Sequence, residues 1–302
     1  MQSRSLNRVR RREVLTECGY KIRSFQRARD FLDRAEAMLY EEEDRNATMI
    51  ATANMIASGS DVFRGPFWYA IVAGGESKCL ACMMHSKPDG LLMTEMPEGA
   101  GDVLYEAVNQ WIGPPGRVVG SKDQAESLAR RWENDFNVSI KRKDDWEILR
   151  MDSLTEPKKK NTGTLRVGRE EEKEEIARWG QLYSKERPAF ISIEEFFLKK
   201  LGRKELFVLD DDGARSVATV SARTKHGIRI SAVFTPPEFR RRGYADSIVR
   251  QLCMHLMDSG FEFITLTTRE GETVKRLYQG LGFRVVGQKR GVTFCDTNQN
   301  SH

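Results

Sequence analysis

The chain lacks any long apolar run. It has 302 residues, of which 39% are hydrophobic, and its mean hydropathy is −0.54. No stretch approaches the roughly 20 apolar residues that a membrane-spanning helix needs. The first residues also lack the apolar segment of a secretory signal. We therefore expect a cytoplasmic protein with no membrane partner, although composition does not separate the cytoplasm from the nucleus or the mitochondrion.

Cysteine is scarce, and its pattern excludes a disulfide framework. The five cysteines are an odd number, and one close pair is present, Cys79 and Cys82. A structural zinc site needs four ligands, and no second pair of cysteines or histidines accompanies this one, so we expect no metal. Residues 79 and 82 of a regular strand point to opposite faces. We therefore interpret the pair as two reduced thiols in a strand.

An excess of one charge is nearly absent as well. The chain has 49 basic and 44 acidic residues, a net charge of +5. Nucleic-acid binders gather their basic groups on one face, so we expect no nucleic-acid partner for this mixed distribution. The run from Arg8 to Arg12 lies in a segment, 1–15, that we interpret as a flexible basic tail, with a transit peptide as the alternative.

A polar segment without periodicity, 154–163, is the clearest linker. We expect it to join a domain over 16–153 to a second domain over 164–296, with a flexible tail at 297–302. Its three consecutive lysines indicate a solvated tether, and a localisation signal is the alternative.

Both domains show the same predicted order of elements. In the second domain we expect strands at 164–168, 205–209, 215–222, 228–234, 261–267, 283–286 and 292–295, and helices at 170–185, 193–201, 243–258 and 272–280. The first domain follows a similar order. Two halves with one order indicate an internal structural duplication, although their residues do not repeat visibly.

The most informative segment is 231–245. An apolar strand turns at Pro236-Pro237, passes through Arg240, Arg241, Arg242 and Gly243, and enters a helix with apolar residues at a 3.6-residue period. The first amides of a helix have no intrahelical partners, and the helix dipole is positive there. Arginines add donors for phosphate oxygens, so this segment predicts an anion site.

The equivalent turn of the first domain, 96–101, contains no basic residue. It carries Glu98 where the second domain has arginines, and a carboxylate repels phosphate. We therefore expect the first domain to be catalytically silent.

Two motifs carry a resemblance to a known family. The segment Arg240-Arg241-Arg242-Gly243-Tyr244-Ala245 is similar to the R/Q-x-x-G-x-G/A signature of the GNAT superfamily of acyl-CoA-dependent N-acyltransferases. The segment from Leu277 to Phe283 resembles the family's L-Y-x-x-x-G-F motif, and the match covers 163–296. The resemblance implies an α/β (α+β) fold, with a mixed, mostly antiparallel, twisted sheet flanked by helices. It also implies two tandem copies, of which the first is degenerate.

The resemblance further implies an N-acetyltransferase that uses acetyl-CoA as co-substrate and no metal. The acyl group would pass by direct attack, in a ternary complex, to the primary amine of a small molecule or peptide. Tyr278 would be the catalytic general acid, and Val233 and Thr235 would pair with the pantetheine arm. The pyrophosphate would be held by six consecutive residues, Arg240, Arg241, Arg242, Gly243, Tyr244 and Ala245.

Several alternatives stay open. Tyr278 also belongs to an apolar helical stripe, which is typical of core. Gly271 stands where many members of the family have an asparagine that contacts the cofactor, and the strand 227–235 lacks a carboxylate base. Glu194, Glu195 or water relayed through Ser231 are candidates for that base. The competing functions are a non-catalytic acyl-CoA-binding or sensing module, and an interaction protein whose first half forms a homodimer.

Overall fold

The computed structural model describes residues 13–15, 19–59, 67–74, 78–86, 90–156, 162–187, 191–271 and 274–296. Contacts divide the chain into two compact units. Unit 1 is Met1–Trp146 with Gln288–His302, and unit 2 is Glu147–Gly287. In contrast to the domain limits expected from the sequence, the residues after Gly287 group with the first unit.

Unit 1 is a sheet between two pairs of helices. Its elements are β1 (Glu13–Leu15), β2 (Lys21–Phe25), α1 (Ala28–Glu41), α2 (Glu43–Ala57), β3 (Phe67–Ala73), β4 (Cys79–Ser86), β5 (Gly90–Met93), α3 (Ala100–Trp111), β6 (Arg117–Gly120), α4 (Lys122–Asp135) and most of β7 (Val138–Met151). Helices α1 and α2 share one apolar cluster with the sheet, and α3 and α4 share another. Pairing is antiparallel along β1 to β5, and β5 runs parallel to β6.

Unit 2 has the same construction. Its elements are β8 (Thr164–Val167), α5 (Lys173–Glu186), α6 (Ile193–Gly202), β9 (Leu206–Asp210), β10 (Ala214–Ser221), β11 (Gly227–Phe234), α7 (Tyr244–Asp258), β12 (Phe263–Arg269), α8 (Lys275–Gly280) and the start of β13 (Arg284–Asp296). The strands β8 to β11 pair antiparallel in chain order, and β11 runs parallel to β12. The expected mixed, mostly antiparallel sheet with flanking helices is confirmed.

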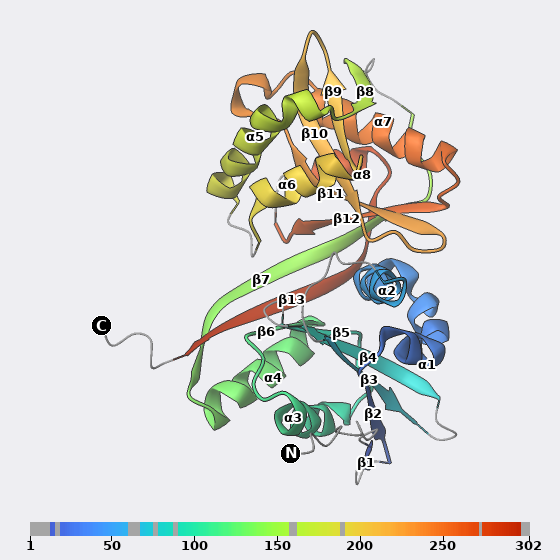
Figure 1. Ribbon diagram of the computed structural model, residues 1–302, viewed down its shortest axis with the longest axis vertical. Helices are drawn as coiled ribbons and strands as arrows, with labels where there is room; N and C mark the ends of the chain where they lie inside the picture. Colours follow the sequence, from blue (N-terminus) through green and yellow to red (C-terminus); the bar gives the residue numbers. More distant parts are fainter. Residues whose placement is uncertain are drawn as a thin grey trace, which may run out of the picture. The chain divides into compact units, whose positions relative to one another are not determined.

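Helices cover both faces of the sheet in unit 2 (Figure 1). Helix α7 packs on one face, against buried residues such as Ile228 and Ile230, because alternate residues of β11 point to that side. Helices α5 and α6 pack on the opposite face, where Trp179 and Phe197 are fully buried. Both helices have an apolar stripe at helical spacing, which explains why they lie flat on the strands.

The two units share one order of elements, from β2 to β7 and from β8 to β13. This repetition confirms the tandem arrangement. The prediction of two short strands at 283–286 and 292–295 is wrong, because β13 is continuous over 13 residues. Gly291 lies inside this strand, where it permits a close approach: a Cβ there would lie 2.6 Å from the indole of Trp146.

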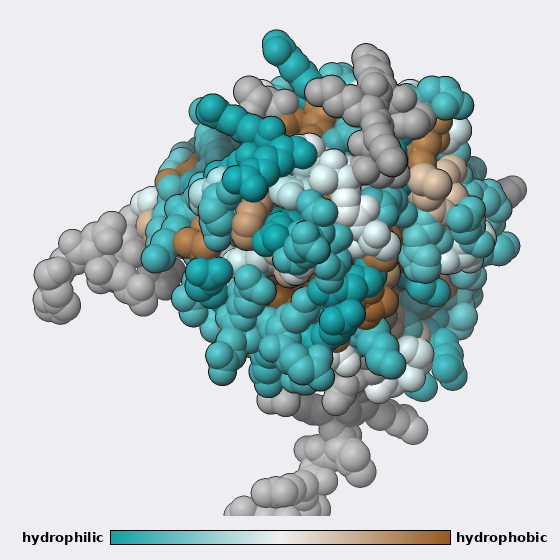
Figure 2. Space-filling view, turned by 90° about the horizontal axis from the view of Figure 1, so that it is seen from above, coloured by the Kyte–Doolittle hydropathy of each residue, from teal (hydrophilic) through white to brown (hydrophobic). Residues whose placement is uncertain are grey.

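The surface agrees with the charged composition. The face seen in Figure 2 is largely hydrophilic, and apolar groups show there in small separate patches. Within the described ranges, no helix combines the length and the apolar character that crossing a bilayer requires.

Candidate functional site

The site begins where two parallel strands of unit 2 separate. Strand β11 pairs with β12 at Gly227, Ile228 and Arg229, and then continues alone on that side to Phe234 within the described residues. On its other side, the register with β10 shifts near the end of β11, and Ala232 has a left-handed backbone with φ of 46°. Such a bulge bends the strand and changes the direction of its backbone groups.

A cleft of about 440 Å³ opens at this separation. It brings together eight of the nine predicted site residues: Val233, Thr235, Arg240, Arg241, Gly243, Tyr244, Ala245 and Tyr278. The exception is Arg242, which does not line the cleft and is exposed. Residues outside the predicted site complete the lining: Tyr183, Glu186, Arg187, Phe234, Phe239, Asp246, Val274 and Leu277.

One end of the cleft is the start of α7. Gly243 is the N-cap residue, with φ of 85° and ψ of 0°, and its carbonyl accepts the amide of Ser247 at 3.0 Å. A Cβ on Gly243 would meet only Thr162, at 3.9 Å, so the glycine is required for its backbone conformation. The amides of the first turn of α7 have no intrahelical acceptor and are suited to an anion.

Arg240 already has an anionic partner. Its Nη2 donates to both carboxylate oxygens of Glu186, at 2.7 and 2.8 Å, and its Nε donates to the carbonyl of Thr235 at 2.9 Å. The guanidinium also lies 5.7 Å from the ring centroid of Phe234. Arg240 therefore joins the end of α5 to the end of β11, and a phosphate could bind its Nη2 only by replacing Glu186.

Tyr244 lines the cleft, and its hydroxyl has a partner outside the cleft lining. The hydroxyl donates to Oδ2 of Asp211 at 2.7 Å, and this hydrogen bond raises the pKa of Tyr244. Asp211 belongs to the hairpin between β9 and β10, so this contact ties the first residue of α7 to that hairpin.

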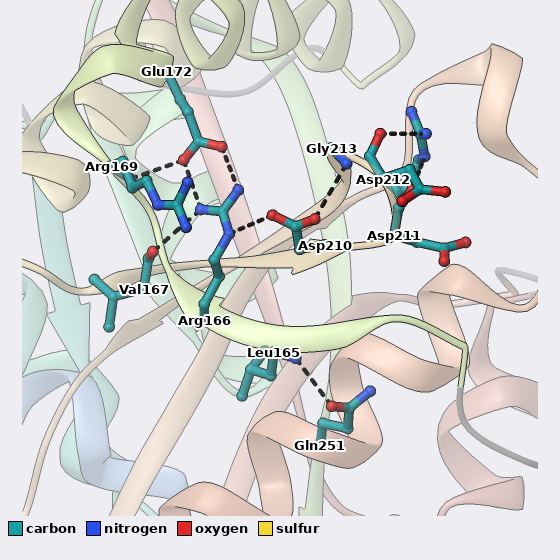
Figure 3. A network of polar contacts seen from close by, with 11 residues as sticks. Leu165, Arg166, Val167, Arg169, Glu172, Asp210, Asp211, Asp212, Gly213 and Gln251 are labelled. Carbon is teal, nitrogen blue, oxygen red and sulfur yellow. Dashed lines mark hydrogen bonds and ion pairs between the residues drawn. The ribbon is translucent and has the colours of Figure 1, made fainter.

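The hairpin is anchored in turn to the edge strand β8 (Figure 3). Oδ2 of Asp210 accepts from Nε of Arg166 at 2.6 Å, and Oδ1 accepts from the amide of Gly213 at 3.1 Å. Arg166 also donates to Glu172 from Nη1 at 2.8 Å. Hydrogen bonds from Arg166 lower the pKa of both carboxyl groups. The start of α7 therefore rests on a chain of charged contacts.

The opposite wall of the cleft is α8. Tyr278 is 8% exposed, and its ring packs edge-on against Phe283 with centroids 6.0 Å apart. Val274 and Leu277 line the cleft beside it. Tyr278 therefore belongs to the core of unit 2 and also lines the cleft.

The candidates for a general base lie outside the cleft lining. Glu194 accepts from the side-chain amide of Gln181 at 3.0 Å, and Glu195 lies in the first turn of α6. The hydroxyl of Ser231 is hydrogen-bonded to that of Ser221 at 2.5 Å.

Two carboxylates do line the cleft, Glu186 and Asp246. Both oxygens of Glu186 are held by Arg240, and Asp246 lies 3.6 Å from Arg250 on the same helix. Sequence reasoning missed both, because Glu186 ends an acid-rich helix without a distinguishing motif. Across the described ranges, no three His, Cys, Asp or Glu side chains are grouped as metal ligands would be.

Gly271 replaces the asparagine that the sequence resemblance leads one to expect, and its backbone conformation favours glycine. Its φ is 79°, and nothing lies within 4 Å of where its Cβ would be. Asparagine tolerates this conformation better than most residues. The backbone at this position is therefore compatible with either residue.

Unit 1 keeps the shape of the turn but not its charge. Gly99 precedes α3 with φ of 78° and ψ of −8°, close to the values at Gly243. Its connector has six residues, 94–99, against nine in unit 2, 235–243, and the missing stretch would hold the arginines. The side chain of Gln124 bonds both the amide and the carbonyl of Met96, at 3.0 and 2.7 Å. The connector backbone is thus engaged within unit 1.

Comparison with known proteins agrees with this geometry. A family model described as FR47-like protein matches residues 212–292, which run from the β9–β10 hairpin into β13. The matched segment contains every residue of the predicted site. No curated protein matches the chain.

Solved structures show the fold over nearly the whole chain. A GCN5-related N-acetyltransferase from Sphaerobacter thermophilus is 15% identical, with 92% of this chain and 96% of that chain covered and a TM-score of 0.56. A GNAT-family acetyltransferase from Colwellia psychrerythraea is 12% identical, with 91% and 99% covered and a TM-score of 0.53. A tandem GNAT protein from the clavulanic acid biosynthesis pathway is 10% identical, with 91% and 97% covered and a TM-score of 0.51. The resemblance seen in the sequence is confirmed, and the chain has the GNAT fold in its two-domain form.

Proposed function

We propose that unit 2 is an N-acyltransferase, which transfers an acetyl or other acyl group from acyl-CoA to a primary amine on a small molecule or peptide. One observation carries the proposal. Five of the six signature residues before and at the start of α7 line the same cleft as Tyr278 on α8, which lies more than 30 residues further along the sequence.

The cleft suits coenzyme A along its length. At one end, Gly243 and the amides of Tyr244 and Ala245 would hold the pyrophosphate, with Arg241 beside them. Beyond Arg229, β11 no longer pairs with β12. The backbone from Val233 to Thr235, which lines the cleft, would align the pantetheine arm as an added strand does. The carbonyl of Thr235 already accepts from Arg240, so pairing at this residue would use its amide.

The proposed acyl transfer needs only limited catalysis from the side chains of the protein. The bound thioester supplies an activated acyl group that an amine can attack directly. A free thiol has a pKa of about 8.5, so the departing sulfur needs only limited help from a proton donor. Tyr278 would donate that proton, and a backbone amide at the β11 bulge would stabilise the negative charge on the carbonyl oxygen.

The proposal is tested by binding followed by turnover. Titration calorimetry should show that acetyl-CoA binds the full chain, after which release of free thiol is measured with a panel of amines. A hydrogen bond to a charged group contributes about 1.5–3 kcal/mol, and about 1.4 kcal/mol corresponds to tenfold in affinity. We therefore expect Arg241→Gln to weaken binding by about tenfold, whereas the neighbouring Arg242→Gln changes it less, because Arg242 does not line the cleft.

The two other outcomes are distinct. Binding without thiol release for any amine would support the non-catalytic acyl-CoA-binding module, in which Tyr278 serves only as core. Failure to bind acetyl-CoA would overturn both readings of the cleft.

A further inference from the structure

Unit 1 contains a pair of thiols that the proposed function does not use. The Sγ atoms of Cys79 and Cys82 lie 3.6 Å apart in β4. The prediction that the two side chains point to opposite faces of the strand is therefore wrong. Both are free cysteines, and both are buried.

A bulge in β4 explains the change of face. Val72 of β3 pairs with Ala81 of β4, and the next residue of β3, Ala73, pairs with Cys79. Leu80 is therefore an extra residue in β4. One extra residue reverses the alternation of side chains from that point, which places residues 79 and 82 on the same face.

Gly74, which follows β3, lies against this bulge. A Cβ on Gly74 would lie 2.8 Å from the side chain of Leu80. The amide of Gly74 donates to the carbonyl of Lys78, the residue directly before Cys79, at 3.0 Å. On the other side, the amide of Cys82 donates to the hydroxyl of Thr94 at 2.9 Å. The backbone on both sides of the pair is thus held in place.

The two thiols differ in access. Cys82 is fully buried in the apolar cluster under α1, whereas Cys79 is 8% exposed at the start of the strand. A hydrogen bond with Cys82 lowers the pKa of Cys79, and burial raises the pKa of Cys82. The more accessible sulfur is therefore also the one that loses its proton more readily.

We propose that Cys79 and Cys82 form a redox-active dithiol that closes to an intrachain disulfide on reaction with a low-molecular-weight disulfide. The Cys79 thiolate attacks one sulfur of the small disulfide, forms a mixed disulfide and releases one small thiolate. The Cys82 thiol passes its proton to a small thiolate and then attacks Sγ of Cys79, which releases the second small thiolate. The small disulfide gains two electrons and becomes two small thiols. These thiols take up the two protons that Cys79 and Cys82 lose. This site is separate from the cleft of unit 2 and does not depend on the proposed function.

The test is oxidation of the intact chain with glutathione disulfide, followed by alkylation, trypsin and mass spectrometry. Cleavage after Lys78 and Arg117 gives a peptide, 79–117, in which Cys79 and Cys82 are the only cysteines. We expect this peptide to lose two hydrogens, to carry no alkyl group, and to regain both thiols with dithiothreitol. Two alkylated thiols, or a glutathione adduct that persists on Cys79, would overturn the proposal.

Two variants test whether the reaction takes place at Cys79 and Cys82. Cys82→Ser should stop at a stable glutathione adduct on Cys79, whereas Cys253→Ser, at a buried cysteine of α7, should close the disulfide like the unmodified chain. Serine at a fully buried position can disturb packing, so a second measurement uses the unmodified chain. A trivalent arsenical that bridges two neighbouring thiols should bind once in 79–117 and block the oxidation. Absence of this adduct from the reduced chain would contradict the geometry on which the proposal rests.

Discussion

The side chain of Tyr278 carries the proton transfer in the proposed reaction. Replacing it with phenylalanine keeps the ring that packs against Phe283 and removes only the hydroxyl. A general acid typically contributes a factor of about 100 or more, and less where the leaving group is already stable, as a thiolate is. We therefore expect Tyr278→Phe to lower kcat by roughly tenfold to a hundredfold. Calorimetry should show an unchanged Kd for acetyl-CoA, and an unchanged kcat across pH would contradict the role.

Gly243 supplies the backbone conformation of the anion site. An alanine there is strained because φ is 85°, at a cost of about 1–2 kcal/mol. Gly260, just beyond the other end of α7, offers a matched control, with φ of 95° and open space around its Cβ position. We expect Gly243→Ala and Gly260→Ala to lower the free energy of unfolding similarly. Only Gly243→Ala should weaken acetyl-CoA binding, and equal binding by the two variants would argue against the site.

The same residues show what sequence can and cannot reveal about the site. The signature residues are contiguous, so they could be identified without a structure. The partner of Arg240 could not, because Glu186 lies 54 residues away and has no motif of its own. The pairing of Cys79 with Cys82 was missed for a different reason: the alternation rule assumes a regular strand, and the bulge at Leu80 breaks it.

Among the elements, the edge strand β8 supports the hairpin that holds α7. Arg166, which is 19% exposed, binds Glu172 and Asp210. Hydrogen bonds to charged groups contribute roughly 1.5–3 kcal/mol, so we expect Arg166→Met to lower the free energy of unfolding by about 2 kcal/mol at pH 7. The control is Arg130→Met, since Arg130 is 69% exposed and its ion pair with Glu126 should contribute little.

The pH dependence of this network follows from its carboxyl groups. Arg166 lowers the pKa of Glu172 and of Asp210 below their unfolded values of about 4.3 and 3.9. The stabilisation is therefore present above those values and disappears as the pH falls through the lower pKa values of the folded state. Urea unfolding from pH 7 to pH 2 should show the difference between the unmodified chain and Arg166→Met shrinking below about pH 4. A difference in unfolding free energy that stays constant across this pH range would exclude these carboxyl groups as the origin of the stabilisation.

The existence and order of the elements could be predicted, because helix and strand periodicities are local. The pairing of the strands could not be predicted, because it depends on contacts between distant parts of the chain. The separation of β11 from β12 depends on where their shared register ends, at Arg229, and on the bulge at Ala232. The length of β13 was missed because Gly291 indicates a turn in sequence, whereas in the structure it makes room for Trp146.

For the whole molecule, the end of the chain belongs to the core of unit 1. Val292 is fully buried, and Phe294 packs edge-on against Trp132 at 6.2 Å. Arg290 pairs with Asp145 at 2.7 Å. Burying each large apolar side chain contributes about 1.5–3 kcal/mol, so a chain ending at residue 287 should lose several kcal/mol of stability in unit 1.

That prediction has a close control. A chain ending at Asp296 keeps all of β13, so its urea unfolding should match the full chain. Limited proteolysis of the chain ending at 287 should cut within residues 19–146, while the control resists. Equal resistance of the two truncated chains would contradict the assignment of the last strand to unit 1.

The central claim is that one of the two units, the second, is built to bind acyl-CoA. The connector of unit 1 keeps the glycine geometry but has neither arginines nor a free backbone at Met96, so it should not bind. Calorimetric titration of acetyl-CoA into the full chain tests this most directly. We expect one molecule bound per chain and weaker binding by Gly243→Ala. Two molecules per chain, or none, would contradict it.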